Sequence, residues 1–196
     1  FSAVMTEEIA ASGAVGSAVR NGIGYFPIYL GPLLLFVFGW RIIERLALKI
    51  ASSGWEFDQI LCLARGGMRP GDVLSRVFDK PLAIMSTSSY RAEAGTIQGR
   101  LDMAKYITMP KGELAGRVLL VDDLADSGVT LKAVVERLRG VPAIAELRSA
   151  VIWVKGVSTY MPDYFVETLP TSPWIHQPFE EYDGLRPDGL AKKFAV

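Results

Sequence analysis

The sequence predicts an α/β fold in which helices flank a central parallel sheet, because short apolar runs alternate with segments of helical periodicity. Two of these runs, Ile60–Ala64 and Val118–Val121, lack polar alternation, as is typical of strands covered on both faces. Each run is followed by a glycine-containing turn and then by a helical pattern. Ligands of such sheets bind at the carboxyl ends of the strands, so the two turns predict the binding edge.

The other elements follow the same alternation. Residues Trp40–Ser52 carry apolar side chains at helical spacing and predict an amphipathic helix, and Asp72–Phe78 predicts a second one. Leu131–Leu138 predicts the helix after the second strand. A later apolar run, Val151–Val154, predicts a strand that ends in Lys155.

The strand at Val118–Val121 opens into a turn rich in carboxylates and hydroxyls, with the sequence Asp122-Asp123-Leu124-Ala125-Asp126-Ser127-Gly128-Val129-Thr130. A loop that enters a helix N-terminus points backbone N–H groups and the positive end of the helix dipole at one spot, which suits a phosphate. The adjacent carboxylates repel each other, so a divalent cation or sugar hydroxyls should offset their charge. These features indicate a phosphorylated ribose. The alternative is a simple capping turn, with Ser127 as the N-cap.

This segment resembles the phosphoribosyl-pyrophosphate (PRPP) signature of type I phosphoribosyltransferases, an apolar strand followed by Asp-Asp-x-x-Asp-Ser/Thr-Gly-x-Thr. The resemblance implies a single-domain fold with a small hood region, and it assigns residues 122–130 to PRPP. Asp122 and Asp123 would hold the ribose hydroxyls and contact Mg²⁺, while Asp126–Thr130 would wrap the 5-phosphate. Asp126 would also face the imidazole edge of a purine and act as general base.

A second turn, Arg65-Gly66-Gly67-Met68-Arg69-Pro70-Gly71, follows the strand at Ile60–Ala64. An arginine fork flanked by small residues can bind a group with several negative charges, although Arg-Gly turns are also common at protein surfaces. In the resembling family this turn binds the pyrophosphate, which assigns Arg65 and Gly66 to PRPP. The resemblance also implies a strained peptide bond between Ala64 and Arg65, with the cis form as one option.

A polar segment, Arg91–Arg100, follows Ser88-Ser89-Tyr90 and has no periodicity of its own. Such a loop in a compact domain is usually either functional or disordered. The resemblance places a lid here that closes over PRPP and excludes water, with contacts from Ser89, Tyr90 and Arg100. A solvated loop is the alternative.

Aromatic side chains and a lysine in the C-terminal part of the chain point to the second substrate. An indole can stack on a planar base and an ammonium can donate to its exocyclic oxygen. Taken alone, Trp174 is more typical of a core residue and Lys155 of a solvated strand end. The segments Asp163–Val166 and Trp174–Glu180 resemble those of bacterial xanthine-guanine phosphoribosyltransferases. That resemblance assigns Lys155 to the purine 6-oxo group, Trp174 to stacking and the backbone around Ile175 to the 2-substituent.

The implied reaction joins a 6-oxopurine to PRPP with Mg²⁺ as cofactor and gives a nucleoside 5'-monophosphate and pyrophosphate. His176 stands where the family carries an acid, which leaves the choice among guanine, xanthine and hypoxanthine open. Glu180 is a further candidate acid for the metal, beside Asp122 and Asp123. The alternatives are a phosphoribosyltransferase for another base, such as orotate, and a regulatory protein that binds PRPP without catalysis.

Composition excludes several other classes. The 21 basic and 21 acidic residues leave no net formal charge, which argues against a nucleic-acid surface. Because His176 is the one histidine, a His-based metal cluster or catalytic triad is excluded. The single cysteine, Cys62, lies in an apolar strand and fits a reducing cytoplasm. The family resemblance also implies a homo-oligomer.

Residues 1–35 precede the resemblance, which begins at about Phe36; the roughly 160 residues of 36–196 suffice for one phosphoribosyltransferase domain with a single core. Asn21–Trp40 carries twenty residues without a formal charge, long enough to span a bilayer, although its glycines and prolines weaken a helix. Three interpretations stand: a membrane anchor or targeting segment, a poorly ordered or packing extension, and upstream sequence translated from a wrong start. The chain begins with Phe1 rather than Met, so an incomplete sequence is a further option. Any membrane contact would involve this extension alone.

Overall fold

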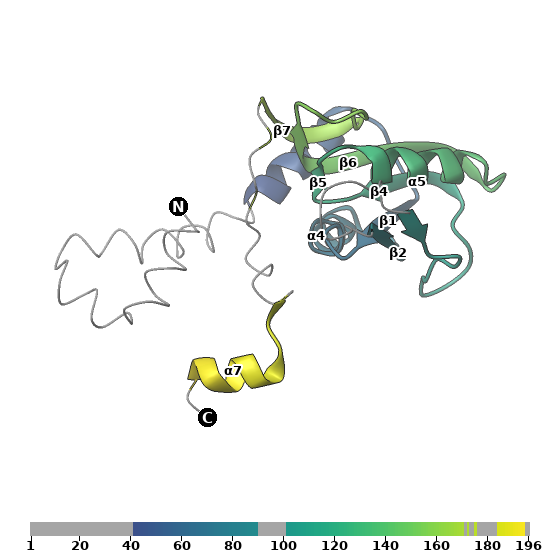
Figure 1. Ribbon diagram of the computed structural model, residues 1–196. Helices are drawn as coiled ribbons and strands as arrows, with labels where there is room; N and C mark the ends of the chain where they lie inside the picture. Colours follow the sequence, from purple (N-terminus) through teal and green to yellow (C-terminus); the bar gives the residue numbers. More distant parts are fainter. Residues whose placement is uncertain (1–40, 90–100, 171, 173–174, 176–183, 195–196) are drawn as a thin grey trace. The chain divides into compact units, whose positions relative to one another are not determined.

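The computed structural model describes residues 41–89, 101–170, 172, 175 and 184–194 of the chain. These residues fall into two compact units, Phe36–Ser172 and a smaller one that contains the C-terminal residues Pro173–Val196 (Figure 1). The smaller unit contributes the helix α7, Pro187–Phe194, which has an acid in its first turn and two lysines in its last turn. This charge order suits the helix dipole.

A seven-stranded sheet forms the centre of the larger unit, with the strand order β3-β2-β1-β4-β6-β5 and with β7 also paired to β6. The pairs among the described strands are parallel except for β2 with β3, which is antiparallel. The strands are β1 Gln59–Ala64, β2 Leu82–Ser89, β3 Leu101–Met103, β4 Gly116–Val121, β5 Leu124–Ala125, β6 Ile144–Lys155 and β7 Tyr164–Leu169.

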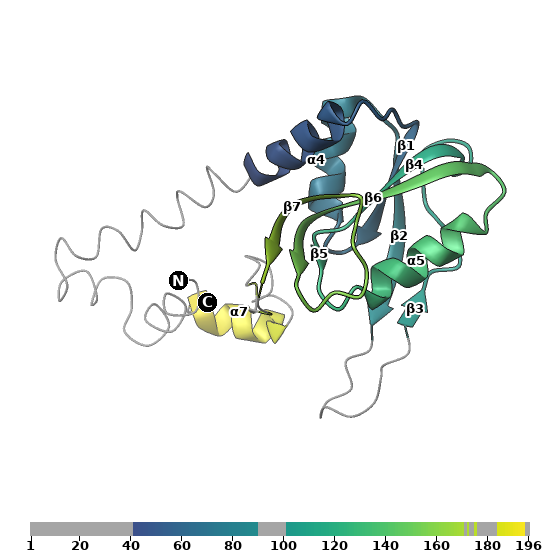
Figure 2. The same cartoon turned by 90° about the horizontal axis from the view of Figure 1, so that it is seen from above.

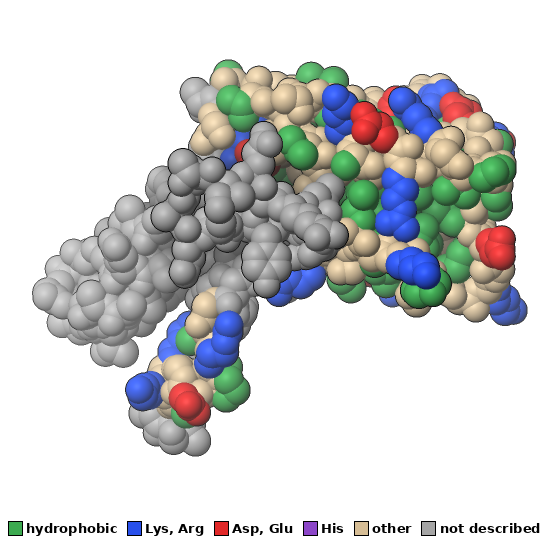
Figure 3. Space-filling model, turned by 45° about the vertical axis from the view of Figure 1, so that its right-hand side comes forward, with side chains coloured by type: hydrophobic (Ala, Val, Ile, Leu, Met, Phe, Trp, Pro, Cys, Tyr) green, Lys and Arg blue, Asp and Glu red, His purple; other side chains and the backbone are tan. Residues whose placement is uncertain are grey.

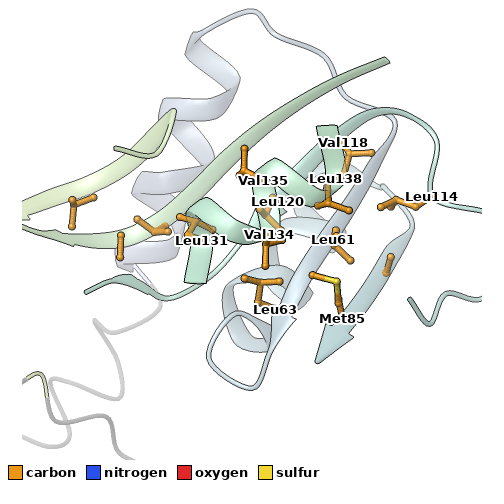
Figure 4. Close-up of a cluster of buried hydrophobic side chains, with 14 residues drawn as sticks. Leu61, Leu63, Met85, Leu114, Val118, Leu120, Leu131, Val134, Val135 and Leu138 are labelled. Carbon is orange, nitrogen blue, oxygen red and sulfur yellow. The ribbon is translucent and has the colours of Figure 1, made fainter. Parts of the chain in front are cut away.

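Helices cover both faces of this sheet (Figure 2). One face packs against α5, Val129–Arg139, and Figure 4 shows apolar side chains of β1, β2 and β4 meeting those of the helix. The opposite face packs against the helical residues 41–52 and against α4, Met68–Phe78. The core on the α5 face includes Leu61, Leu63, Met85, Val118, Leu120, Leu131, Val134 and Leu138. The core on the other face includes Ile43, Leu46, Ile50, Ile60, Leu74, Leu119 and Val121.

The predicted α/β fold, with a central parallel sheet and flanking helices, is confirmed. Several boundaries differ from the sequence pattern. The helix α4 begins at Met68 instead of Asp72, so the basic turn after β1 is shorter than predicted. Strand β2 extends through Ser88 and Ser89 to pair with β3, so these serines end a strand. The short strand β5 interrupts the predicted loop after β4.

The described surface carries mixed charge. Basic and acidic side chains are interspersed on the face of the larger unit shown in Figure 3, as expected for a chain with equal numbers of both. In the part of the chain that the structure describes, every helix falls short of the length and apolarity needed to cross a membrane. The apolar stretch Asn21–Trp40 lies outside the described residues.

Candidate active site

Two of the predicted site segments begin at neighbouring strand ends. Strands β1 and β4 are parallel, with Cys62 opposite Val121, so the chain leaves both strands at the same edge of the sheet. A Cβ added at Gly66 would overlap the carboxylate of Asp123, and one added at Gly67 would overlap the carbonyl oxygen of Val121. The turn after β1 therefore lies directly against the acidic residues after β4, and glycine permits this close approach.

The turn after β1 contains the residues assigned to the pyrophosphate. The peptide bond between Ala64 and Arg65 is cis, which is the form that the family resemblance named as an option. The turn is short because α4 begins at Met68. Arg65 and Gly66 are thus held between the end of a buried strand and the start of a helix.

The backbone of the acidic pair Asp122–Asp123 is hydrogen-bonded to β6. The N–H of Asp122 donates to the carbonyl of Ala150 at 3.1 Å, and the carbonyl of Asp123 accepts the N–H of Ile152 at 3.0 Å. The Asp122 carboxylate accepts the N–H of Asp123 at 2.9 Å. These bonds fix the two carboxylates at the strand end, where a free loop would leave them variable in position.

Burial dominates the electrostatics of this pair. Removal from water, together with repulsion from Asp123, raises the pKa of Asp122 well above its ordinary range. Removal from water also raises the pKa of Asp123, while hydrogen bonds and the charge of Arg69 oppose that rise. Both groups therefore ionise at a cost in free energy, which a bound cation or hydroxyl donors would reduce.

Asp126 and Lys155 form an ion pair, with 3.0 Å between a carboxylate oxygen and Nζ. Strand β5 runs parallel to β6 with Ala125 opposite Val154. The next residue in each chain segment, Asp126 after β5 and Lys155 in β6, therefore lies beside the other. The side chain of Lys155 is 5% exposed and that of Asp126 is 42% exposed. A buried ammonium needs a charged partner, and Asp126 supplies it while keeping part of its carboxylate open to solvent.

The loop between β5 and α5 presents the N-terminus of a helix. Its N-cap is Gly128 with φ 76°, and α5 begins at Val129. The N-cap position considered for Ser127 is therefore occupied by Gly128. The Ser127 hydroxyl accepts only a long hydrogen bond, at 3.5 Å, from the backbone nitrogen of Val129. A Cβ at Gly128 would lie 2.5 Å from Ser158 Oγ and 2.7 Å from the backbone nitrogen of Tyr160. Both the positive φ and the lack of space for a Cβ therefore require glycine at position 128. The first backbone N–H groups of α5 can bind a phosphate.

Of the remaining predicted site residues, the structure describes Ser89 and Ile175. Strand β2 is parallel to β1, with Ser86 opposite Ala64, so Ser89 lies at the same edge of the sheet. Ser89 ends β2 and pairs with Leu101 of β3, while Ile175 belongs to the smaller compact unit. Among the described side chains, no three potential metal ligands of the types His, Cys, Asp or Glu gather in one place, so the described part of the predicted metal site is the acidic pair. The predicted residues outside the described ranges are Tyr90, Arg100, Trp174, His176 and Glu180.

Sequence reasoning missed two contributions to the site. Arg69 falls within the predicted basic turn but receives no role there, whereas its charge acts on Asp123 from the first turn of α4. The segment Ser158–Tyr160 contacts the backbone at Gly128. The small and polar residues after Lys155 indicate a turn, but nothing in their pattern reports which loop that turn contacts.

Comparisons with known proteins connect this geometry to a family. The family model of the phosphoribosyl transferase domain matches residues 39–183. The chain is 27% identical over 149 residues to a xanthine-guanine phosphoribosyltransferase of Idiomarina loihiensis, covering 74% of this chain and 86% of that protein. It is 32% identical over 139 residues to a hypoxanthine/guanine phosphoribosyltransferase of Methanopyrus kandleri, covering 65% of this chain and 70% of that protein.

Solved structures show the same similarity. A xanthine-guanine-hypoxanthine phosphoribosyltransferase of Helicobacter pylori superposes with a TM-score of 0.60 at 26% identity, covering 80% of this chain and 94% of that chain. A purine phosphoribosyltransferase from Pyrococcus horikoshii superposes with a TM-score of 0.56 at 30% identity, covering 70% of this chain and 89% of that chain. The similarity therefore covers most of the length of each of these proteins.

Proposed function

The chain belongs to the phosphoribosyl transferase family, and from this premise we propose that it transfers the phosphoribosyl group of PRPP to a 6-oxopurine. Membership makes it an enzyme of the pentosyltransferase class. The observation that carries the purine proposal is the ion pair of Asp126 with the buried Lys155, beside the acidic pair and the turn after β1. The similarity to proteins named as purine phosphoribosyltransferases supports it.

PRPP consists of a pyrophosphate, a ribose and a 5-phosphate, and this edge of the sheet offers a different kind of group to each. The Arg65 guanidinium and the backbone of Gly66 would bind the pyrophosphate, because an arginine fork matches phosphate oxygens. The acidic pair Asp122–Asp123 would accept hydrogen bonds from the ribose hydroxyls. The loop Asp126–Thr130 would bind the 5-phosphate at the N-terminus of α5.

The acidic pair also fits Mg²⁺. Two carboxylates whose pKa values are raised by burial would ionise more readily beside a divalent cation, and Mg²⁺ binds one or two carboxylates together with substrate phosphates. We propose Asp122 and Asp123 as its protein ligands, with Glu180 as the further candidate that the sequence names. Held there, Mg²⁺ would supply positive charge that stabilises the pyrophosphate as it leaves.

The transfer itself needs one proton acceptor and one orienting donor. The bond between ribose C1 and the pyrophosphate oxygen breaks, the electron pair leaves with the pyrophosphate, and a purine ring nitrogen bonds to C1. The proton of that nitrogen passes to the carboxylate of Asp126. The ammonium of Lys155 carries three N–H donors, so it can hold Asp126 and donate to the 6-oxo oxygen at once. Trp174 and the backbone at Ile175 remain the proposed contacts to the ring face and the 2-substituent.

A panel of bases tests the proposal. The full chain is mixed with PRPP, Mg²⁺ and, one at a time, guanine, xanthine, hypoxanthine, adenine or orotate, and pyrophosphate release is followed. We expect release with at least one 6-oxopurine and far less with adenine and orotate. Release with orotate alone would replace the purine proposal with another base. Binding of PRPP without release on any base would indicate a regulatory protein.

A further inference from the structure

The connection between β6 and β7, residues 156–163, runs back along the sheet. The two strands are parallel neighbours with Ala150 opposite Tyr164, so the chain that leaves β6 at Lys155 returns to the level of Ala150 before β7 begins. Parallel neighbours usually need a crossover of a dozen or more residues, often with a helix. This connection is shorter and contains no described helix. Hydrogen bonds from both its backbone and its side chains hold its course.

A chain of hydrogen bonds around the buried Ser149 anchors the connection to β6. The Ser149 side chain is 0% exposed, and its hydroxyl lies 3.0 Å from the Tyr160 hydroxyl and 2.9 Å from a carboxylate oxygen of Asp163. A carboxylate accepts and a serine hydroxyl has one proton, so Tyr160 donates to Ser149 and Ser149 donates to Asp163. The same Asp163 oxygen accepts the backbone N–H of Ser149 at 2.7 Å. The far end of the connection is thus fixed at one point of β6.

The near end of the connection supports the loop before α5. Thr159 donates both its backbone N–H and its hydroxyl to the carbonyl of Ser127, each at 2.9 Å. Ser158 Oγ donates to the carbonyl of Tyr160 at 2.8 Å, which makes a tight turn of these three residues. The same turn packs against Gly128, where it leaves no room for a Cβ. The backbone at Ser127 and Gly128 therefore rests on the residues that Tyr160 anchors.

We propose that the Tyr160–Ser149–Asp163 hydrogen-bond chain positions the loop that binds the 5-phosphate of PRPP. It fixes the turn 158–160, and the hydrogen bonds from Thr159 in that turn hold the carbonyl of Ser127 in place. The N–H groups at the start of α5 follow directly after it. The inference rests on the proposed function, because that function assigns the loop to the phosphate. The three residues of the chain are positioning residues, which act through Thr159 without touching substrate.

The variant Tyr160→Phe removes the hydroxyl that begins the hydrogen-bond chain and keeps the ring. We expect the KM for PRPP to rise about fivefold, the factor that one lost hydrogen bond typically represents, with little change in kcat. The matched control is Tyr164→Phe. Its hydroxyl is also hydrogen-bonded, to Ser53 and to Arg148 at 2.9 Å each, but it belongs to the core on the opposite face. An unchanged KM in Tyr160→Phe, or an equal rise in the control, would overturn the proposal.

A second pair of variants tests the link to the loop. Thr159→Val removes the hydroxyl bond to Ser127 while keeping the branched shape, and Thr159→Ser retains the hydroxyl. We expect the valine variant to raise the KM for PRPP and the serine variant to restore it to near the wild-type value. Equal KM values in the two variants would show that the hydroxyl does not position the loop.

Hydrogen exchange separates this inference from the proposed function, because it needs no turnover. The N–H of Lys132 donates to the carbonyl of Gly128 at 2.9 Å, and the N–H of Thr159 donates to Ser127. Both amides should exchange faster in full-length Tyr160→Phe than in the wild type or in Tyr164→Phe. If the wild type lacked transferase activity but showed this pattern, the proposed function would fail and the support of the loop would stand. Unchanged exchange in an active enzyme would sink the positioning role alone.

Discussion

The Nζ of Lys155 lies 3.0 Å from a carboxylate oxygen of Asp126, and this ion pair joins the end of β6 to the loop that follows β5. It therefore connects the group proposed to select the purine with the group proposed to take its proton. Asp126 is also the first residue of the loop proposed to hold the 5-phosphate. One parallel register, between β5 and β6, thus positions residues of both proposed substrate sites.

Replacing the buried ammonium should change base selectivity. The variant Lys155→Met keeps an unbranched side chain and removes the three N–H donors. We expect kcat/KM for 6-oxopurines to fall about 10- to 100-fold, because a hydrogen bond to a charged group is worth about 1.5–3 kcal/mol. Lys49→Met is the control, since the Lys49 ammonium is also hydrogen-bonded, to the backbone carbonyls of Phe165 and Val166, but is exposed. Steady-state rates with guanine and adenine would contradict the assignment if Lys155→Met reduced both equally.

Removing the charge of Asp126 should slow the chemical step. Asp126→Asn retains size and polarity but cannot accept the purine proton, so kcat should fall about 10²- to 10⁴-fold. Asp72→Asn, which breaks an exposed ion pair with Arg76 at 3.1 Å, should keep wild-type turnover. Turnover with guanine is the measurement. A wild-type kcat in Asp126→Asn would rule out the general-base role.

The contact between the turn after β1 and the acidic pair predicts a strict requirement for glycine. In Gly66→Ala the new Cβ would overlap the Asp123 carboxylate, so either the turn or the carboxylate must move. We expect kcat/KM for PRPP to fall at least about tenfold, since misplacement by an ångström can cost about a hundredfold. Gly184→Ala, where a Cβ would meet nothing within 4 Å, is the matched control. Equal kcat/KM values for the two variants would show that the turn tolerates a side chain.

The free cysteine predicts a pH dependence of stability. Burial raises the pKa of the Cys62 thiol from 9.0 to about 11, so above pH 9 the unfolded chain loses a proton that the folded chain keeps. The free energy of unfolding should therefore fall as the pH rises from about 9 to about 11. Urea unfolding across this range should show a steeper decline in the wild type than in Cys62→Ala. Parallel declines would mean that the thiol titrates normally in the folded chain.

Burial on both faces explains which elements the sequence predicts well. A fully apolar run such as Val118–Val121 indicates a strand buried on both faces, so this strand can be predicted from its own residues alone. The start of α4 is harder, because Pro70 and Gly71 look like helix breakers. Proline is tolerated in the first helical turn, and a Cβ at Gly71 would lie 2.6 Å from the Cβ of Cys62, so glycine serves the packing of the helix on β1.

The candidate site divides in the same way. The resemblance names Asp126 and Lys155 separately, since each belongs to a recognisable local motif. Their ion pair depends on the two-residue strand β5, which forms by pairing with β6. Two residues are too few to show a strand periodicity in the sequence. The support of Gly128 by Ser158–Tyr160 is equally non-local, because it depends on where the connection after β6 returns.

The most direct test of the central claim is the stoichiometry of one reaction. The full chain, PRPP, Mg²⁺ and the 6-oxopurine preferred in the panel of bases are mixed, and pyrophosphate and nucleoside 5'-monophosphate are quantified in the same samples. The proposed transfer predicts that both products appear at equal rates and that neither appears without the base. Pyrophosphate released without nucleotide, or no product with any 6-oxopurine, would contradict it.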